Sequence, residues 1–377
     1  MPIFLNNMKL LIVTQAVDTE DPVLGCFVRW IEEFAQRVER IEVICLREGK
    51  HDALPANVRV HSLGKERDAA ENTTIYGSVF RRVRYAFRFK LLAWRLRRDY
   101  DAVFVHMNQE YILIAGPLWK MLGKRVYLWR NHYAGSWVTD VAAAFCTKVF
   151  CTSKHSYTAR YKKTVLMPVG VDTERFFPDA RIERKPNSIL FLGRISPSKR
   201  PEMLIDALAS LARTGATFTA SLIGSPLPQD ETYHESLKEK VRSLSHHKGT
   251  SHFLSRSAPN EMKSLADRVS FHPGVPNGQT PDLYRAHEIF VNASPSGMLD
   301  KTLFEAAACG CRVLAASEDF AALAGPDSHF TDAPELALRL TAALAAPAPQ
   351  TPAPIVAENS LAALSEKLRE ELYSKSL

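Results

Sequence analysis

The stretch FLGRISPSKRPEMLIDALASL, residues 191–211, decides the fold because it runs an apolar strand through a glycine turn into an amphipathic helix. Pro201 suits the first turn of that helix. A helix start offers unpaired backbone N–H groups and the positive end of the helix dipole. Arg194 and Lys199, in the turn, can hold a diphosphate as a planar fork and a point charge. The stretch predicts an anion site, with solvated turn cations as the alternative.

A second stretch, LYRAHEIFVNASPSGMLDKTLFEAAACGCRVLAAS at residues 283–317, strengthens this prediction. It places Glu305 at the start of a helix of small residues, after a Ser-Pro-Ser-Gly loop and before a turn and an apolar strand. The two stretches together favour the anion site over solvated turn cations.

Apolar runs of strand length alternate with helical patterns along most of the chain. Helical stretches such as 27–37 and 112–122 separate the runs, and the polar, turn-rich segment 169–187 divides them into two sets. The expected strands cover residues 8–15, 41–46, 58–63, 102–106, 125–129, 149–152 and 164–169, and then 188–192, 217–223, 269–272, 289–293 and 312–316. The pattern predicts two parallel sheets, each wrapped by helices.

Length and composition suit a protein of two domains. The chain has 377 residues, of which 46% are apolar, and no apolar run approaches the roughly 20 residues of a membrane span. The opening segment leads straight into a strand rather than a signal peptide, so a cytoplasmic protein is expected. Six cysteines without C-x-x-C spacing indicate reduced core thiols, and no metal site is expected.

The net charge of +7 implies an anionic partner. Residues 80–98 are predicted to form one basic amphipathic helix, on which Phe80, Val83, Phe87, Leu91 and Trp94 share a face. Such a helix can lie on an anionic bilayer, and an ordinary solvated surface helix is the alternative. Nucleic acid is not an expected partner because no recognition module is present. The charged residues beside that face are Arg81, Arg82, Arg84, Arg88, Lys90, Arg95, Arg97 and Arg98.

Four motifs, in their order and spacing, resemble glycosyltransferase family 4, and the resemblance covers nearly the whole chain. They are Gly25 in DPVLGCF, the tripeptide Gly170, Val171 and Asp172, the G-R-x5-K-like signature of Gly193, Arg194 and Lys199, and the E-A-x-A-x-G segment of Glu305, Ala306, Ala308 and Gly310.

The resemblance implies an α/β protein of GT-B fold, in which two Rossmann-like, doubly wound domains face each other across a cleft. Residues 1–172 would bind the acceptor and residues 173–345 the nucleotide sugar. Residues 346–377 would form a Pro/Ala linker and a helix that crosses back to the first domain. The implied activity is retaining transfer of a sugar from a nucleotide-sugar donor to an acceptor hydroxyl, in glycolipid, lipopolysaccharide or surface polysaccharide synthesis. The donor is a substrate, and no cofactor is implied.

The resemblance also assigns roles to single residues. Arg194 and Lys199 would neutralise the leaving diphosphate, Glu305 would accept the ribose hydroxyls, and His132 would lie beside the transferred sugar. His106 and Glu110 would meet the acceptor, which would be a glycan or a lipid-linked molecule. A turn-capping histidine is the alternative for His132, and a satisfied strand-end histidine is the alternative for His106. The other donor-binding residues would be Gly25, Gly193, His272, Val275 and Asn277.

The sequence departs from the family in one loop. Two glutamates eight positions apart are usual there, but the position eight before Glu305 is Gly297, and the loop reads PSGMLDK. Asp300 could replace the lost carboxylate, with Lys301 added against phosphate, so Gly297, Met298, Leu299, Asp300 and Lys301 are expected to bind the donor. An exposed ion pair is the alternative for the two charged residues.

Two other functions remain open at this point. One is a GT-B sugar-nucleotide epimerase or hydrolase, which would act on the donor without an acceptor. The other is a catalytically weak subunit that kept the nucleotide pocket and lost the first glutamate.

Overall fold

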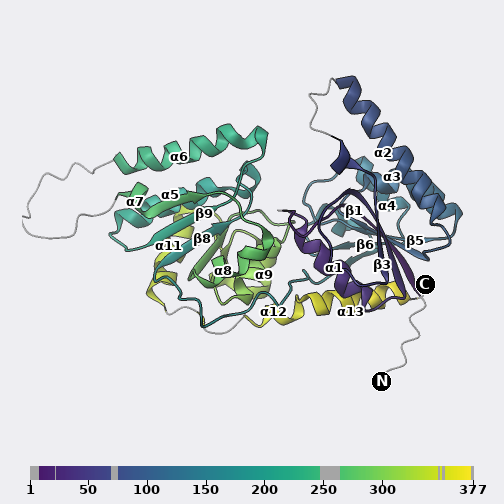
Figure 1. Ribbon diagram of the computed structural model, residues 1–377. Helices are drawn as coiled ribbons and strands as arrows, with labels where there is room; N and C mark the ends of the chain where they lie inside the picture. The colour runs from purple at the N-terminus through teal and green to yellow at the C-terminus, as the bar shows by residue number, and fades with distance from the viewer. Residues whose placement is uncertain are drawn as a thin grey trace, which may run out of the picture. The chain divides into compact units, whose positions relative to one another are not determined.

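The computed structural model describes residues 8–21, 23–68, 75–246, 264–346, 349 and 353–374, and the chain forms two compact units (Figure 1). The first unit comprises residues 1–172, 276–278 and 359–377. The second comprises residues 173–275 and 279–358.

The first unit is built on a seven-stranded parallel sheet in the order β3-β2-β1-β4-β5-β6-β7. Its strands are β1 (Lys9–Val17), β2 (Arg40–Glu48), β3 (Val58–Ser62), β4 (Ala102–His106), β5 (Arg125–Trp129), β6 (Lys148–Cys151) and β7 (Thr164–Leu166). Its helices are α1 (Gly25–Ala35), α2 (Ile75–Arg95), α3 (Glu110–Met121), α4 (Trp137–Ala144) and α13 (Leu361–Tyr373), with short 3-10 turns at η1 (Lys65–Arg67) and η2 (Tyr157–Arg160).

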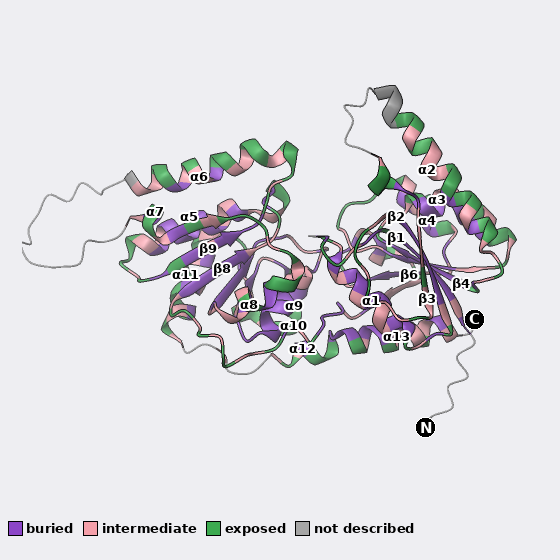
Figure 2. Cartoon of the chain, in the orientation of Figure 1, coloured by how far each residue is buried: buried purple, intermediate pink, exposed green. Residues whose placement is uncertain are grey.

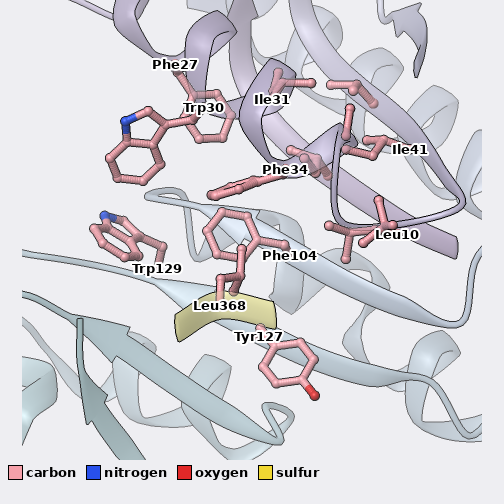
Figure 3. Close-up of a cluster of buried hydrophobic side chains, with 14 of the residues drawn as sticks. Leu10, Phe27, Trp30, Ile31, Phe34, Ile41, Phe104, Tyr127, Trp129 and Leu368 are labelled. Carbon is pink, nitrogen blue, oxygen red and sulfur yellow. The ribbon is translucent and has the colours of Figure 1, made fainter. Parts of the chain in front are cut away.

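Both faces of the central strands of this sheet are buried, which explains why these strands are largely apolar in sequence, whereas the edge strands β3 and β7 have no buried residue. In β1, Leu10 and Ile12 belong to a core shared with α1 and α13, whereas Leu11 and Val13 belong to a core shared with α2, α3 and α4. Figure 3 shows the first of these cores, and Figure 2 shows the central strands as largely buried. Alternate side chains of one strand therefore anchor helices on opposite faces.

The last helix, α13, belongs to the first unit. Its buried leucines Leu361, Leu364, Leu368 and Leu372 follow helical spacing and join the core beside α1. The Ser360 hydroxyl accepts a hydrogen bond from the Ala363 N–H and caps the helix.

The second unit is built on a five-stranded parallel sheet in the order β10-β9-β8-β11-β12. Its strands are β8 (Ser188–Leu192), β9 (Thr219–Ile223), β10 (Val269–His272), β11 (Ile289–Asn292) and β12 (Arg312–Ala315). Its helices are α5 (Pro201–Arg213), α6 (Glu231–His246), α7 (Leu265–Arg268), α8 (Thr280–Arg285), α9 (Lys301–Ala308), α10 (Glu318–Ala324), α11 (Ala333–Ala345) and α12 (Ile355–Glu358). Its 3-10 turns are η3 (Pro197–Lys199), η4 (Pro228–Asp230) and η6 (Pro326–Ser328), and η5 (Asn277–Gln279) is divided between the two units.

Every expected strand is present, with ends that differ by a few residues at most. The expected end of the second domain at residue 345 differs from the structure, because the second unit continues to Glu358 and α12 packs against α9. Much of the expected Pro/Ala linker, residues 347–348 and 350–352, lies outside the described residues, as does the segment 1–7.

Each sheet has one point at which strands that are not consecutive in sequence become neighbours. These points lie between β1 and β4 in the first sheet and between β8 and β11 in the second. Loops that leave the carboxyl ends of the strands on either side of such a point diverge, and open α/β sheets bind ligands there. The fold therefore directs attention to the loops after β1, β4, β8 and β11.

Candidate active site

The loop after β8 presents the two predicted cations next to an open helix start. Arg194 is exposed, and Lys199 is the last residue of η3. Arg200 follows it and is the N-cap residue of α5. Arg200 adopts a left-handed conformation with φ 49°, which is uncommon for a residue with a Cβ atom. Its side chain does not cap the first turn of α5. Pro201 has no N–H and the Met203 N–H donates to the Arg200 carbonyl at 3.1 Å, so an anion would approach this turn at Glu202.

A pair of glycines lets the loops after β8 and β9 approach closely. A Cβ atom at Gly224 would lie 1.8 Å from the Gly193 carbonyl oxygen, so no larger residue fits there. The Gly193 N–H donates to the Ile223 carbonyl at 3.0 Å, and the Gly224 N–H donates to the His272 carbonyl at 3.0 Å. Sequence reasoning missed Gly224, although it follows an apolar strand directly, as Gly193 does.

Lys199 is paired with Asp300 across the point where β8 and β11 become neighbours. The Lys199 Nζ lies 2.5 Å from Asp300 Oδ2, which also accepts hydrogen bonds from the Ser294 hydroxyl at 2.6 Å and from Asn292 Nδ2 at 3.0 Å. Burial opposes ionisation of Asp300, but Lys199 and these hydrogen bonds outweigh it and lower the pKa of Asp300. The two side chains retain 23% and 16% of their exposure, so the ion pair that Asp300 forms with Lys199 is largely buried.

The loop that lacks the first glutamate has its own backbone shape. Gly297 has φ 93°, a left-handed conformation that a glutamate would adopt only with strain, and its N–H donates to Asp319 Oδ2 at 3.0 Å. Leu299 is also left-handed, with φ 35°, and is buried, whereas Met298 is half-buried. Lys301 is half-buried as the first residue of α9. The loss of the glutamate thus accompanies a backbone turn that favours glycine.

Glu305 lies one turn inside α9 rather than at its start, because the helix begins at Lys301. Only 4% of Glu305 is exposed, and Glu305 Oε2 accepts a hydrogen bond from the buried Tyr284 hydroxyl at 3.3 Å. Burial and the charge of Glu305 raise the pKa of Tyr284 well above its ordinary value, so the hydroxyl remains a donor.

The segment expected to line the base follows β10. His272 is exposed, and its Nε2 lies 3.0 Å from the Ser270 hydroxyl, while Val275 is half-buried. Asn277 begins η5 and lies in residues 276–278, which belong to the first unit. The segment is therefore divided between the two units.

Gly25 and His106 are both built into the first unit near the meeting point of β1 and β4. Gly25 is the first residue of α1, where an added Cβ would lie 2.8 Å from the Thr19 carbonyl oxygen. His106 ends β4 and is 8% exposed, with Nδ1 3.3 Å from the Thr14 hydroxyl and its ring stacked on Phe27 at 3.8 Å between centroids. These contacts favour the structural alternative for His106.

His132 and Glu110 follow the neighbouring strands β5 and β4. The Ala134 N–H donates to His132 Nδ1 at 2.9 Å, so this ring nitrogen caps the turn, as the alternative for His132 expected. Because Nδ1 accepts a hydrogen bond, the proton of a neutral ring is assigned to Nε2. Glu110 is exposed at the start of α3. Burial lowers the pKa of Arg130, and the charge of Glu110 partly opposes this shift. Sequence reasoning missed Arg130, a half-buried cation directly after β5.

The structure brings most predicted donor residues to one edge of one sheet. The residues from Gly193 to Lys199, His272 and Val275, and the loop 297–301 all follow strands at the carboxyl edge of the second sheet, and Glu305 lies on the helix after that loop. Gly25 lies in the first unit.

Three further observations concern the described part of the chain. No group of His, Cys, Asp and Glu residues there is arranged to hold a metal ion. No helix within it has the length and apolar character needed to cross a bilayer. All six cysteines are described and free, and five of them are buried.

Comparisons with known proteins agree with this geometry. Residues 172–322 match the family model described as Glycosyl transferases group 1. D-inositol 3-phosphate glycosyltransferase of Kineococcus radiotolerans is 29% identical over 174 residues, which are 43% of this chain and 36% of that protein. Mannosylfructose-phosphate synthase of Agrobacterium fabrum is 29% identical over 166 residues, which are 41% of this chain and 32% of that protein. The aligned part thus spans about a third of these relatives.

Solved structures resemble the chain over almost its whole length. Anabaena HepE in complex with UDP and glucose has a TM-score of 0.69 and 18% identity, and the match covers 98% of this chain and 100% of that one. WaaG, a glycosyltransferase involved in lipopolysaccharide biosynthesis, has a TM-score of 0.61 and 15% identity, and the match covers 97% of this chain and 100% of that one. The chain has the GT-B fold, and the family-model match over residues 172–322 supports a glycosyltransferase.

Proposed function

We propose that this chain is a retaining glycosyltransferase of family 4 that moves a sugar from a nucleotide-sugar donor to a hydroxyl of a glycan or lipid-linked acceptor. The observation that carries the proposal is the position of Lys199. It stands at the meeting point of β8 and β11, beside exposed Arg194 and the uncapped start of α5. Two cations and a helix N-terminus at such a point suit a diphosphate.

The nucleotide sugar is the proposed donor, and no further cofactor is needed. Structures of Anabaena HepE with UDP and glucose, and with UDP-glucose, share the fold of this chain. WaaB, an outer-core galactosyltransferase, and WaaG both belong to lipopolysaccharide synthesis, which supports a role in glycolipid, lipopolysaccharide or surface polysaccharide synthesis.

In the proposed reaction, the acceptor oxygen forms a bond to the anomeric carbon while the bond from that carbon to the diphosphate oxygen breaks. The acceptor proton passes to the leaving diphosphate oxygen. Negative charge grows on the diphosphate, where Arg194, Lys199 and the positive end of the α5 dipole stabilise it. Lys199 has three donors, so it can keep its bond to Asp300 and still bind phosphate.

Other residues are proposed to position the two substrates. Glu305 accepts the ribose hydroxyls, because an ionised carboxylate has acceptor sites beyond the one that Tyr284 uses. His132 presents its Nε2 to the transferred sugar, and Glu110, with Arg130 near it, meets the acceptor. His106 supports this region from the buried end of β4.

We also propose that the protein is cytoplasmic and binds peripherally to the inner face of an anionic membrane through α2. The shared apolar face is exposed along this helix: Phe80 by 71%, Val83 by 61%, Phe87 by 68%, Leu91 by 37% and Trp94 by 46%. Basic residues border this face, as anionic lipids require. A lipid-linked acceptor would be reached from that surface.

The test begins with a thermal-shift screen of nucleotide sugars, since a ligand of the folded state raises its stability by RT ln(1 + [L]/Kd). Turnover of the binding donor is then measured for Arg194→Ala, Lys199→Ala and a matched control, Arg213→Ala, which removes an exposed cation from the far end of α5. The first two variants should lose on the order of 100-fold or more in kcat, and the control should keep normal turnover.

Three results would contradict the proposal. Near-normal turnover of both site variants would remove the diphosphate assignment. Nucleotide release from the donor without an acceptor would favour an epimerase or hydrolase. Donor binding without turnover over a broad acceptor panel would favour a binding subunit, which the glycine at position 297 would then explain.

A further inference from the structure

A basic pocket lies between the loop after β3 and one side of α2, apart from the donor-site loops. It has a volume of about 380 Å³, and its charged lining residues are Arg67, Asp68, Arg84, Arg88 and Arg95. Four arginines against one aspartate leave a net charge of +3 on the lining. A volume of this size is within the range of small-molecule sites.

Two of the arginines, Arg84 and Arg88, donate hydrogen bonds to the protein, and Arg88, Arg67 and Arg95 are exposed. Arg84 donates to Asp68, which also accepts from the Tyr85 hydroxyl, and Arg88 Nη1 donates to the Leu63 carbonyl at 3.0 Å. The buried Nε of Arg84 has no hydrogen-bond partner among the described residues, so this side chain retains an unused donor. The exposed side chains of Arg67 and Arg95 add charge at the rim, where Arg67 Nε lies 3.6 Å from Glu66 Oε1.

The pocket is continuous with the exposed apolar face of α2 through Leu91, which belongs to both. At 100° per residue, Arg84, Arg88 and Arg95 form a row along one border of the apolar face, between that face and the buried side that carries Phe89. Figure 2 shows the outward side of α2 as exposed. An anion in this pocket would therefore stand next to apolar side chains, as in a lipid whose headgroup carries phosphate.

We propose that this pocket binds the phosphomonoester headgroup of a membrane lipid while the apolar face of α2 enters the bilayer. The proposal deepens the membrane association given under Proposed function and rests on it. Arginine suits a phosphate because its planar fork donates two parallel hydrogen bonds. A terminal phosphate exposes three oxygens and carries more charge than a diester, so several arginines can bind it at once.

The test compares vesicles that contain phosphatidic acid, a monoester, with vesicles that contain phosphatidylglycerol, a diester, at matched surface potential in phosphatidylcholine. Binding of the full chain is measured by sedimentation. The pocket variant is Arg67→Gln with Arg95→Gln, which leaves the Asp68 and Leu63 bonds intact. The control is Arg82→Gln with Arg98→Gln, which removes the same charge from exposed positions outside the pocket.

The wild-type chain should prefer the monoester vesicles on the order of tenfold, as one charged hydrogen bond allows. The pocket variant should lose that preference, whereas the control should keep it and lose only general attraction. Equal binding to both vesicles, or equal loss of preference in both variants, would overturn the proposal. Binding of soluble glycerol 3-phosphate in the pocket without any vesicle binding would overturn the lipid assignment.

Failure of this proposal is distinguishable from failure of the glycosyltransferase proposal. Turnover with a water-soluble acceptor is measured in the same variants and should be unchanged in both. Absent turnover together with a retained headgroup preference would reject the enzyme and leave the pocket standing. Normal turnover without a headgroup preference would reject the lipid pocket and leave the glycosyltransferase proposal standing.

Discussion

A carboxylate holds Lys199 in place before any substrate arrives. Asp300 is itself fixed by Ser294 and Asn292, so the ammonium group is oriented by a network that joins the loops after β8 and β11. Because Lys199 is already oriented, it need not be reorganised at the moment of reaction. Electrostatic stabilisation of a leaving group depends on such pre-organised charges. Asp300 thus acts on the proposed reaction through Lys199.

The pairing of Asp300 predicts a specific dependence of stability on pH. The pKa of Asp300 is lowered from 3.8 in the folded state, so its stabilisation is complete above the unfolded value and is lost as pH falls through the folded one. Asp300→Asn keeps the shape of the side chain but cannot change charge. Urea unfolding from about pH 5 to about pH 2 should therefore show a smaller acid loss in the variant than in the wild type. Parallel pH profiles of the two proteins would show that Asp300 titrates normally.

Glu305→Gln should weaken the binding of a nucleoside diphosphate, with or without a sugar, because the proposed contact is to ribose. Loss of a charged hydrogen-bond partner should cost roughly 1.5 to 3 kcal/mol. Calorimetry measures this affinity, and Tyr284→Phe is the matched control because it removes the hydroxyl that donates to Glu305 and leaves the carboxylate. If both variants bind nucleotide equally well, Glu305 has an internal structural role alone.

The positions of Arg194 and Lys199 in the fold were predictable from the sequence, because both lie in the turn between an apolar strand and a helix, and their roles stay predictions. The shape of the loop at Gly297 was not predictable, because it depends on a hydrogen bond to Asp319, a residue 22 positions away. The partner of Asp300 is 101 positions away in the sequence, so only the fold could identify it.

At the scale of the element, α2 carries two sets of apolar side chains that differ in exposure. Phe89 is completely buried against the sheet, whereas Phe87, two residues earlier, is 68% exposed. The sequence identified the exposed face by its spacing, but spacing alone could not decide whether that face or its neighbour meets the core. Contacts of Phe89 with Tyr111 and Trp119 of α3 decide it.

This difference gives a matched pair of variants. Phe89→Ala should lower the free energy of unfolding by about 3 to 5 kcal/mol, the usual cost of a buried phenylalanine. Phe87→Ala should change stability by less than about 0.5 kcal/mol, as surface substitutions do, yet reduce sedimentation with anionic vesicles. Denaturant unfolding and vesicle binding are measured on both proteins. A Phe87→Ala protein that binds vesicles normally would remove the apolar face from membrane binding.

The strands were the most predictable elements for a physical reason. In a parallel sheet covered on both faces, every side chain of a strand is buried, so each strand is a short apolar run between polar turns. Strand β4 illustrates this, because all five of its residues are buried and its bounds agree with the expected range. The start of α9 was placed wrongly, since Lys301 is not apolar and the cap at Asp300 is engaged elsewhere.

At the scale of the whole molecule, the chain returns to its first unit after completing the second. The Asn359 carbonyl accepts hydrogen bonds from the N–H groups of Gly170 and Val171, and Arg125 donates to the Leu372 carbonyl. The first unit is therefore complete only when residues 359–377 have joined it. All five tryptophans of the chain, Trp30, Trp94, Trp119, Trp129 and Trp137, lie in this unit, so tryptophan fluorescence reports on it alone.

Leu368→Ala should consequently destabilise the first unit and leave nucleotide binding unchanged. Leu368 is 2% exposed in the core beside α1, as Figure 3 shows, and its truncation should cost about 2 to 5 kcal/mol. The control is Leu338→Ala, since Leu338 is 73% exposed on α11 of the second unit. Denaturant unfolding followed by tryptophan fluorescence should move to lower denaturant in the first variant and stay in place in the second. Because the proposed donor contacts lie largely in the second unit, calorimetric affinity for a nucleoside diphosphate under native conditions should be the same in both. Loss of nucleotide affinity in Leu368→Ala would mean that α13 supports the donor site as well as the core of the first unit.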